Sequence, residues 1–422
     1  MADQHSLARS LQQAADSRPE VLAVLAGDRA WTAGEWLDDC RAAAMRLENN
    51  GRPLAAAGGS LALARWSFAC SLSGRAFWPL APMRQPPPRL PELPGVALII
   101  STSGSEGQAR AVLLGAAQLN AAATAANARL GLGADDLWLN CLPLFHIGGQ
   151  SILWRSARAG AAMLLHEGFA AATVGADLAR HPVTHLSLTP AMLAALLDHG
   201  VTPPASLRVA LIGGAALSPM LYERATAAAW PLWPSYGMSE SAALVAAHDP
   251  ADGPWRAGLA GRPLAGCRVR IGDDGRIHLS GPQVMIGYLD GGGLDADGWL
   301  KSGDLGRIDA DGRLTVQGRA DDMLISGGYN LHPQTIEGCL AACPGVRDVA
   351  VSGRPDPVWG DLIVAVVVGS ADLAALKAHV SGQLPAAAAP RQVIHVDRLP
   401  RNASGKLDRA ALRQLAAASA AG

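Results

Sequence analysis

Two kinds of hydrophobic pattern alternate along the first 240 residues of the chain. Stretches with apolar residues every three or four positions predict helices, and short apolar runs predict buried strands. The helical stretches cover residues 7–17, 32–47, 117–130 and 150–159. The strand-like runs cover residues 21–25, 96–100, 137–142, 161–165, 185–188 and 207–212. Such alternation is typical of parallel sheets that are covered by helices.

The pattern changes near residue 257. Short apolar runs there are separated by turns such as Asp273-Asp274-Gly275, which predicts antiparallel strands joined by hairpins. After Asp321 strands and helices mix again. We therefore predict an α/β protein. Its large N-terminal domain, residues 1–320, contains helix-covered sheets and a small antiparallel part like a β-barrel, and a small α+β domain covers residues 322–422.

Composition narrows the function classes. A length of 422 residues predicts two or three domains, and a formal net charge of -1 provides no basic surface for nucleic acid. None of the six cysteines forms a Cys-x-x-Cys pair, so neither a zinc site nor a disulfide framework is indicated. No apolar run approaches the roughly 20 residues of a membrane span, and the N-terminus lacks an apolar signal core. We expect a cytoplasmic protein with reduced thiols.

Residues 101–110 form a loop rich in serine, threonine and glycine, and they directly follow the apolar run 96–100. Small hydroxyl residues and glycines let the backbone approach phosphate oxygens, and Arg110 adds a fixed positive charge. The loop lacks the spacing of a Walker P-loop. Taken alone, it is either a phosphate-binding loop or an ordinary polar turn.

Six further motifs follow this loop. They are Gly213-Gly214-Ala215, Ser235-Tyr236-Gly237-Met238-Ser239-Glu240, the stretch 298–304 that ends in Asp304, Gly318-Arg319-Ala320-Asp321-Asp322, the stretch 326–333 that contains Gly327-Gly328-Tyr329, and the stretch 400–407 that contains Gly405-Lys406. In content and order, the loop and these motifs resemble the core motifs of the adenylate-forming superfamily of acyl-CoA synthetases and ligases. Any one of them alone is a weak signal, whereas seven in the family's order are specific.

The resemblance implies that a carboxylic acid attacks the α-phosphate of ATP, giving acyl-AMP and pyrophosphate, and that a thiol, here of CoA, then takes the acyl group. Holding the triphosphate and neutralising its charge is positional and electrostatic work. The implied cofactors are therefore ATP, Mg²⁺ and CoA, with a small carboxylic acid as substrate. Neither nucleic acid nor a membrane is expected as a partner. A homodimer is compatible with the sequence, which does not fix the oligomeric state.

The same resemblance assigns residues to roles. Lys406, which would bridge the acid and the α-phosphate, His146 and Arg110 are the catalytic candidates. Glu240 would help to coordinate Mg²⁺, and Asp304 would bind the ribose hydroxyls. The residues expected to bind ATP or AMP are Thr102, Ser103, Gly104, Ser105, Gly107, Gly213, Gly214, Ala215, Tyr236, Gly237, Ser239, Asp304 and Arg319.

Several of these residues also have an ordinary structural interpretation. Asp304 could end a turn, Glu240 could stabilise a helix start, and Tyr236 could belong to the core. Lys406 could be a solvated surface lysine. In each case the position within the family motif favours the functional role.

The C-terminal motifs imply movement. Asp321 resembles the family's hinge, about which the C-terminal domain is thought to rotate between an adenylation pose and a thioesterification pose. In the second pose Gly327, Gly328 and Tyr329 would line the entry of CoA. A surface turn would have the same sequence.

The loop departs from the family pattern. Arg110 replaces the usual lysine, Glu106 replaces the usual threonine, and Ala109 stands where proline is common. Arg110 keeps the positive charge, but Glu106 adds a negative charge near the expected pyrophosphate. The N-terminal domain is also shortened around residues 48–90. Phosphate binding and turnover are therefore expected to be weaker than is usual in the family.

Residues 142–155 indicate which carboxylic acid is the substrate. They contain Phe145-His146-Ile147-Gly148-Gly149-Gln150 and Trp154-Arg155, similar to the corresponding stretch of o-succinylbenzoate–CoA ligases of menaquinone synthesis. An aromatic dicarboxylate needs cationic or hydrogen-bonding side chains, and His146, Gln150 and Arg155 are the candidates. Trp154 and Arg155 could instead simply pack along their helix.

Two other functions stay open. One is a ligase for another aryl or short-chain acid, or with a carrier-protein thiol as acceptor. The other is a degenerate nucleotide-binding protein without turnover, which Glu106 and the short N-terminal region suggest and which Asp304, Arg319 and Lys406 oppose.

Overall fold

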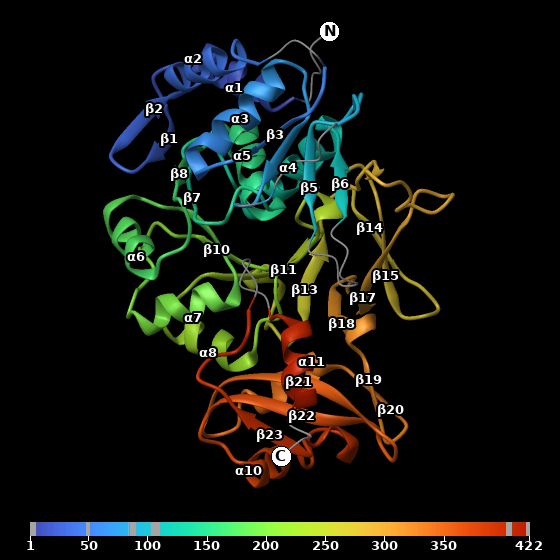
Figure 1. The fold of residues 1–422 in the computed structure, drawn as a ribbon. Coiled ribbons are helices and arrows are strands. Elements are labelled where there is room, and N and C mark those ends of the chain that lie inside the picture. Colours follow the sequence, from blue (N-terminus) through green and yellow to red (C-terminus); the bar gives the residue numbers. More distant parts are fainter. Residues whose placement is uncertain are drawn as a thin grey trace.

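The longest sheet of the molecule joins antiparallel and parallel strands in one path (Figure 1). The structure is a computed structural model that describes residues 6–47, 51–82, 84, 90–102, 110–401 and 407–418. In spatial order the strands are β14 (Arg268–Ile271), β15 (Arg276–Ser280), β17 (Leu300–Ile308), β18 (Leu314–Arg319), β13 (Leu259–Pro263), β12 (Ala246–Ala247), β11 (Leu232–Tyr236), β10 (Val209–Ile212), β9 (His185–Leu188), β7 (Leu137–Asn140), β8 (Ala162–Leu165), β1 (Leu22–Ala26) and β2 (Arg29–Thr32). The run from β11 to β1 is parallel, and the strands from β14 to β12 are antiparallel.

A second sheet lies beside the first and carries the loop of interest. Its strands are β16 (Gly287–Tyr288), β6 (Ala111–Leu114), β5 (Leu98–Ser101), β4 (Phe77–Leu80) and β3 (Leu54–Ala57). β5 and β6 are antiparallel neighbours, so residues 102–110 connect the two strands of a hairpin. The apolar pattern predicted a strand at β5, but it left Ala111–Leu114 unassigned, so β6 was not predicted.

Helices cover both sheets. They are α1 (Leu7–Ser17), α2 (Ala33–Ala44), α3 (Ser60–Leu72), α4 (Ala116–Leu130), α5 (Ile147–Ala159), α6 (Ala171–Arg180), α7 (Pro190–Asp198) and α8 (Pro219–Ala227). Thr32 caps α2, since its hydroxyl accepts from the Glu35 amide and the Glu35 carboxylate accepts from the Thr32 amide. The buried core between sheet and helices contains large side chains such as Trp36, Phe68 and Trp138.

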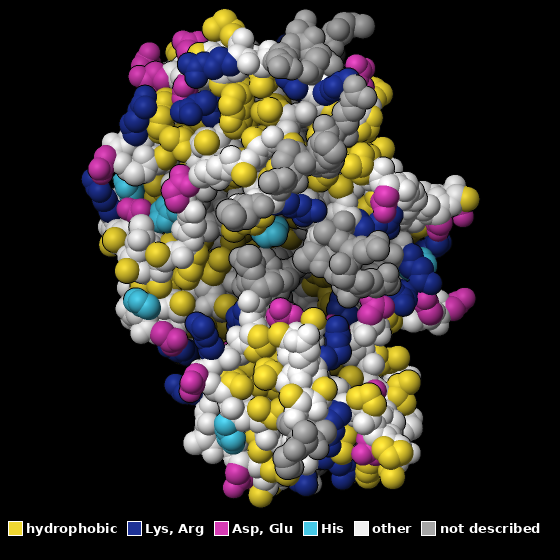
Figure 2. All heavy atoms as spheres, in the orientation of Figure 1, with side chains coloured by type: hydrophobic (Ala, Val, Ile, Leu, Met, Phe, Trp, Pro, Cys, Tyr) yellow, Lys and Arg dark blue, Asp and Glu magenta, His cyan; other side chains and the backbone are white. Residues whose placement is uncertain are grey.

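The C-terminal part is smaller and has its own sheet and core. Its strands are β20 (Tyr329–Leu331), β19 (Leu324–Ser326), β22 (Gly360–Gly369), β21 (Val346–Asp356) and β23 (Gln392–His395). The helices α9 (Pro333–Leu340) and α10 (Leu373–Val380) pack with them around a separate hydrophobic cluster, and α11 (Arg409–Ala418) contributes Leu412 to a second one. Figure 1 shows this part, in orange and red, as a lobe below the rest, and Figure 2 shows charged side chains of both signs along the waist between the two.

The predicted α/β class, with a large N-terminal part and a smaller C-terminal part, is confirmed. The helix predicted over 7–17 and the strand predicted over 185–188 have the predicted bounds. The predicted barrel-like part consists of antiparallel strands that continue the parallel sheet through β12 and β13. Among the described residues, no helix is long and apolar enough to cross a membrane.

Candidate nucleotide and acid site

Three predicted motifs lie at one edge of the parallel sheet. β7, β10 and β11 run in the same direction, so the loops after them leave at the same edge. Those loops contain His146, the turn 213–215 and the segment 237–240. Ligands of open α/β sheets bind beyond the carboxyl ends of the strands. The fold therefore brings these three predicted motifs to the edge at which a ligand is expected.

One group of contacts, here called the Asp304 cluster, contains Tyr236, Asp304, Arg319 and Asp321. The Tyr236 hydroxyl donates to Asp304 Oδ2 at 2.7 Å, and Arg319 Nη1 lies 3.5 Å from Asp304 Oδ1. Arg319 Nη2 also donates to Asp321 at 3.0 Å. β17 and β18 position the charged pair, because Asp304 and Arg319 are directly opposite each other in the ladder. The cluster therefore joins three of the sequence-predicted nucleotide residues to the predicted hinge residue.

Burial and charge fix the protonation states of this cluster. Burial and the neighbouring Asp304 carboxylate raise the pKa of Tyr236 well above its ordinary value, so its hydroxyl stays a donor. Burial opposes the charge of Arg319, but Asp304, Asp321 and Asp322 outweigh it and raise the Arg319 pKa. The Asp304 side chain is 15% exposed. The cluster thus offers a partly open carboxylate held by a neutral phenol and a permanent cation.

Tight backbone packing supports the segment after β11. A Cβ on Gly237 would overlap the carbonyl oxygen of Ala243, so only glycine fits there. Ala242 and Ala243 have φ values of 52° and 91°, a left-handed conformation that costs side-chain-bearing residues energy. This strained turn directly follows Ser239 and Glu240. It therefore places the predicted α-phosphate and Mg²⁺ residues on a well-determined backbone.

A second group of contacts, here called the Glu240 network, contains Arg110, Tyr288, Asp290 and Glu240. Arg110 Nη2 donates to Asp290 Oδ1 at 2.9 Å and to the Gly291 carbonyl at 2.8 Å. Its guanidinium lies 3.6 Å from the centre of the Tyr288 ring. The Tyr288 hydroxyl donates to Glu240 Oε1 at 2.9 Å. Arg110, predicted to face phosphate directly, is thus held by Asp290 at the base of the hairpin.

Glu240 suits a magnesium ion that arrives with a nucleotide. Mg²⁺ prefers oxygen ligands and is usually held by one or two carboxylates plus substrate phosphates. In the described part of the chain Oε1 of Glu240 accepts the Tyr288 hydroxyl, whereas no partner is found for Oε2. Among the same residues, no group of three acidic, His or Cys side chains could hold an ion alone. The residues fit a nucleotide-borne ion better than a resident one.

The three predicted acid-binding residues do not share one environment. His146 is the N-cap residue of α5 and packs against Phe145. Gln150 is fully buried, and its amide accepts from Ser67 at 3.0 Å and donates to the Leu144 carbonyl at 2.8 Å. Both polar ends of that side chain are thus occupied by the protein. Gln150 therefore supports the turn before α5.

Arg155 lies elsewhere on α5. It is 3% exposed, and its guanidinium lies 5.4 Å from the centre of the Trp138 ring. Among the described residues no carboxylate pairs with it, and burial lowers the pKa of Arg155 to about 10. A buried cation without an anion is costly, although an aromatic face offsets part of the cost.

Asp321, Gly327, Gly328 and Tyr329 lie at the start of the C-terminal part. Asp321 belongs to the single helical turn Ala320–Asp322 that connects β18 with β19, and its Oδ1 lies 3.8 Å from Arg276. The Gly327 amide donates to the Trp359 carbonyl at 2.9 Å, and Gly327 and Gly328 both have positive φ. Tyr329 is 55% exposed, so its ring is free to contact a ligand or another surface.

Some predicted residues lie outside the described residues. They are Ser103, Gly104, Ser105, Gly107, Glu106, Ala109 and Lys406. The described ends of both segments are paired. The Thr102 amide donates to the Arg110 carbonyl at 2.8 Å, and Arg401 pairs with Leu407 in an antiparallel bridge.

Tyr288 and Asp290 belong to none of the seven sequence motifs. They lie about 180 residues after Arg110 and reach it because β16 pairs with β6. No local pattern could have shown this. A weak signal was the short apolar run before Gly287-Tyr288, which predicts a strand but not its partner.

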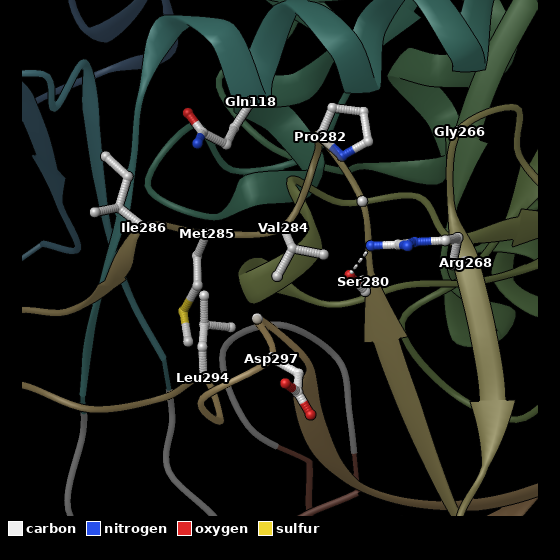
Figure 3. Close-up of a pocket in the computed structure, with 12 residues that line it drawn as sticks. Gln118, Gly266, Arg268, Ser280, Pro282, Val284, Met285, Ile286, Leu294 and Asp297 are labelled. Atoms are coloured by element: carbon white, nitrogen blue, oxygen red, sulfur yellow. Dashed lines mark hydrogen bonds between the residues drawn. The ribbon is translucent and has the colours of Figure 1, made fainter.

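A cavity of about 600 Å³ lies beside the Glu240 network (Figure 3). Figure 3 shows Val284, Met285 and Leu294 along it, with Arg268 donating to Ser280 at 2.8 Å. None of the predicted site residues is among its described lining residues. It therefore flanks the expected chemistry and does not contain it.

Comparison with known sequences agrees with the motifs. The family model for AMP-binding enzymes matches residues 59–289, and the model for the AMP-binding enzyme C-terminal domain matches residues 335–406. The 2-succinylbenzoate–CoA ligase of Bacillus velezensis is 36% identical over 338 residues, which cover 76% of this chain and 69% of that protein.

Solved structures give the same relationship. The o-succinylbenzoate CoA synthetase of Bacillus subtilis in complex with its acyl-adenylate intermediate superposes with a TM-score of 0.85 at 28% identity, covering 96% of this chain and 97% of that chain. A double mutant of that synthetase bound to a product analogue gives 0.68 at 28% identity, with coverages of 96% and 98%. The present structure therefore superposes more closely on the acyl-adenylate complex than on the product-analogue complex.

Proposed function

This chain belongs to the AMP-binding enzyme family, and we propose that it activates o-succinylbenzoate with ATP and transfers the acyl group to CoA. The products are acyl-CoA, AMP and pyrophosphate. The Asp304 cluster carries this proposal, because it presents a held carboxylate beside a phenol at the edge where a nucleotide belongs. The identity of the acid and of the thiol is inferred from the names of the similar proteins.

Each residue then acts by position and charge. Asp304 accepts hydrogen bonds from the ribose hydroxyls, with Tyr236 and Arg319 holding its carboxylate in place. Ser239 and the loop from Thr102 onward bind the phosphates. Glu240 holds Mg²⁺, which neutralises phosphate charge when it is bound. Lys406 neutralises the negative charge between the attacking carboxylate and the α-phosphate, and Gly213, Gly214 and Ala215 line the adenine.

The acid is recognised on the α5 side of the site. His146, at the N-cap of α5, contacts the reacting acid. Arg155 is the stronger candidate for a second carboxylate, because its buried charge has no anionic partner among the described residues. Gln150 acts only through the turn that it supports. Arg155→Met should therefore reduce activity with o-succinylbenzoate more than activity with a benzoate that lacks the second carboxylate.

The transfer step requires the C-terminal part to turn. We place the joint at the turn Ala320–Asp322, with residues 1–320 and 322–422 as the two bodies. The lower TM-score with the product-analogue complex is consistent with such a second arrangement. In that arrangement Gly327, Gly328 and exposed Tyr329 line the path of CoA. A cytoplasmic location and a homodimer stay predictions, the latter open to a sedimentation measurement.

One assay tests the function. Pyrophosphate release from ATP and Mg²⁺ is measured with a panel of acids, with and without CoA. We expect release with o-succinylbenzoate and thioester formation when CoA is present. Release with other aryl acids but not with o-succinylbenzoate would replace the substrate, and a carrier-protein thiol that outperforms CoA would replace the acceptor. No release with any acid would overturn the activity.

Lys406→Ala separates the two half-reactions. Loss of a charge that acts in the transition state costs roughly 100- to 1000-fold in acyl-AMP formation. Transfer from supplied acyl-AMP to CoA should be nearly unchanged, because Lys406 is assigned to the first step alone. Equal loss of both half-reactions would contradict this assignment.

A further inference from the structure

The Glu240 network connects the start of β6 with the predicted Mg²⁺ residue. β16 pairs with β6 so that Tyr288 lies opposite Val112, which brings its ring over Arg110. The same segment also reaches the backbone of Glu240, since the Met285 amide donates to the Glu240 carbonyl at 2.8 Å. Both the backbone and the side chain of Glu240 are thus held by residues 285–288.

Asp290 determines where Arg110 points. The Arg110 Nε lies 3.2 Å and 3.3 Å from the two Asp290 carboxylate oxygens, and Nη2 lies 2.9 Å from Oδ1. Such a forked arrangement needs the planar guanidinium, and a lysine could not reproduce it. Asp290 also neutralises much of the charge that Arg110 would otherwise direct at a phosphate. Arg110 therefore acts more through Tyr288 than as an open phosphate-binding cation.

We propose that Asp290 and Tyr288 are positioning residues that, through Arg110, fix the Glu240 carboxylate in the orientation required for Mg²⁺·ATP. Asp290 holds the guanidinium, the guanidinium holds the Tyr288 ring, and the Tyr288 hydroxyl occupies Oε1 so that Oε2 faces the ion. The 2.9 Å hydrogen bond that the Tyr288 hydroxyl donates to Glu240 Oε1 carries this assignment. This inference rests on the proposed use of ATP but assigns residues that the motifs do not contain.

Calorimetric titration tests the proposal without turnover. Tyr288→Phe keeps the ring beneath Arg110 and removes only the hydroxyl. We expect affinity for Mg²⁺·ATP to fall about fivefold, as is usual for loss of one hydrogen bond, and affinity for ATP in chelator to stay unchanged. Tyr222→Phe, a tyrosine stacked on Trp255, is the matched control and should change neither affinity.

The variant Asp290→Asn distinguishes two roles of Asp290: positioning Glu240, or competing with phosphate for Arg110. If Asp290 positions Glu240, this variant weakens Mg²⁺·ATP binding by a few fold, spares metal-free ATP, and adds little to Tyr288→Phe, since both break one chain of contacts. If Asp290 only competes with phosphate for Arg110, the variant binds ATP more tightly with and without Mg²⁺, which would overturn the proposal. Asp297→Asn, an exposed carboxylate on the same segment, is the control.

Two further outcomes are informative. Equal weakening of Mg²⁺·ATP and metal-free ATP by Tyr288→Phe would show a general structural role and overturn the proposal. Binding of Mg²⁺·ATP by the unsubstituted protein without pyrophosphate release would overturn the proposed function and leave this inference standing. The Asp290 side chain is 63% exposed, so its replacement should not prevent folding, which circular dichroism checks.

Discussion

The Asp304 cluster and the Glu240 network use the same residue types in two different arrangements. In the first, Tyr236 and Arg319 both contact one carboxylate, whose side chain is 15% exposed. In the second, Tyr288 lies between Arg110 and Glu240. The side chains of the ion pair there are more exposed, 38% for Arg110 and 63% for Asp290.

The difference concerns how much each carboxylate depends on its neighbours. Asp304 is held from two sides and is mostly buried, so removing its charge weakens the contacts of a buried phenol and takes away one of the two carboxylates that pair with Arg319. Glu240 is held by one hydroxyl at the end of a solvent-exposed chain, where ion pairs contribute little to stability and are screened by salt. We therefore expect large effects in the Asp304 cluster and small, metal-dependent effects in the Glu240 network.

The largest effect should come from Asp304→Asn. This change removes one of the two negative charges that hold Arg319 and replaces one of the carboxylate oxygens assigned to the ribose by an amide nitrogen. Hydrogen bonds to charged groups contribute about 1.5–3 kcal/mol, so kcat/KM for ATP should fall by about 10- to 100-fold. Steady-state kinetics measures this. A loss of less than about twofold would mean that the two regions do not differ as described.

Gly303→Ala should have the next largest effect. A Cβ at this position would overlap the Arg319 guanidinium, which must move away from Asp304. We expect about a tenfold loss of kcat/KM for ATP with little change in the free energy of unfolding. Gly168→Ala is the matched control, because nothing lies within 4 Å of its added Cβ. Equal loss in both variants would point to a general backbone effect.

The sequence predicts the Asp304 cluster better than the Glu240 network. Asp304 and Arg319 lie fifteen positions apart on two paired strands, and their motifs indicated a shared site. Tyr288 and Asp290 contact Arg110 across about 180 residues, which no local pattern reports. The helix over residues 7–17 and the strand over residues 185–188 were predicted because periodicity is local, whereas β6 and the elements between residues 48 and 80 were not predicted.

The acid side shows another limit of sequence patterns. Gln150 and Arg155 were both predicted to contact the acid, because their stretch resembles that of o-succinylbenzoate–CoA ligases. The structure shows that Gln150 is bound by Ser67 and Leu144, and that Arg155 lies over Trp138. Side chains on one helix face different neighbours, and the sequence alone does not say which neighbours already satisfy them.

An alkaline titration tests the burial of Tyr236. The pKa of Tyr236 is raised in the folded protein, so folding favours the neutral phenol. The contribution of the neutral Tyr236 phenol to the free energy of unfolding is therefore fully present below pH 10. It is lost as the pH rises, because the unfolded chain releases the phenol proton near pH 10. By pH 11 the loss reaches about 1.4 kcal/mol, and Tyr236→Phe should show correspondingly less alkaline loss in urea unfolding. Tyr288→Phe should shift the alkaline loss in the same direction, because burial and Glu240 also raise the pKa of Tyr288. An alkaline loss that Tyr236→Phe leaves unchanged would contradict the burial of the Tyr236 phenol.

The smallest effect should come from Arg110→Lys. Lysine keeps the charge but loses the fork to Asp290, so KM for Mg²⁺·ATP should rise about threefold or less. The free energy of unfolding should change by less than about 1 kcal/mol, as for other exposed ion pairs. A loss as large as that of Asp304→Asn would show that Arg110 contacts the phosphates directly.

Arg319 has one consequence that reaches beyond its own cluster. Its guanidinium contacts Asp304, the proposed ribose ligand, and Asp321, at the proposed joint with the C-terminal part. If rotation at this joint breaks the contact between Arg319 and Asp321, nucleotide binding at Asp304 and the orientation of the C-terminal lobe become thermodynamically linked. Linkage is reciprocal, so any factor by which nucleotide favours one orientation is also the factor by which that orientation favours nucleotide. Release of AMP would then depend on the same bond that sets the lobe in motion.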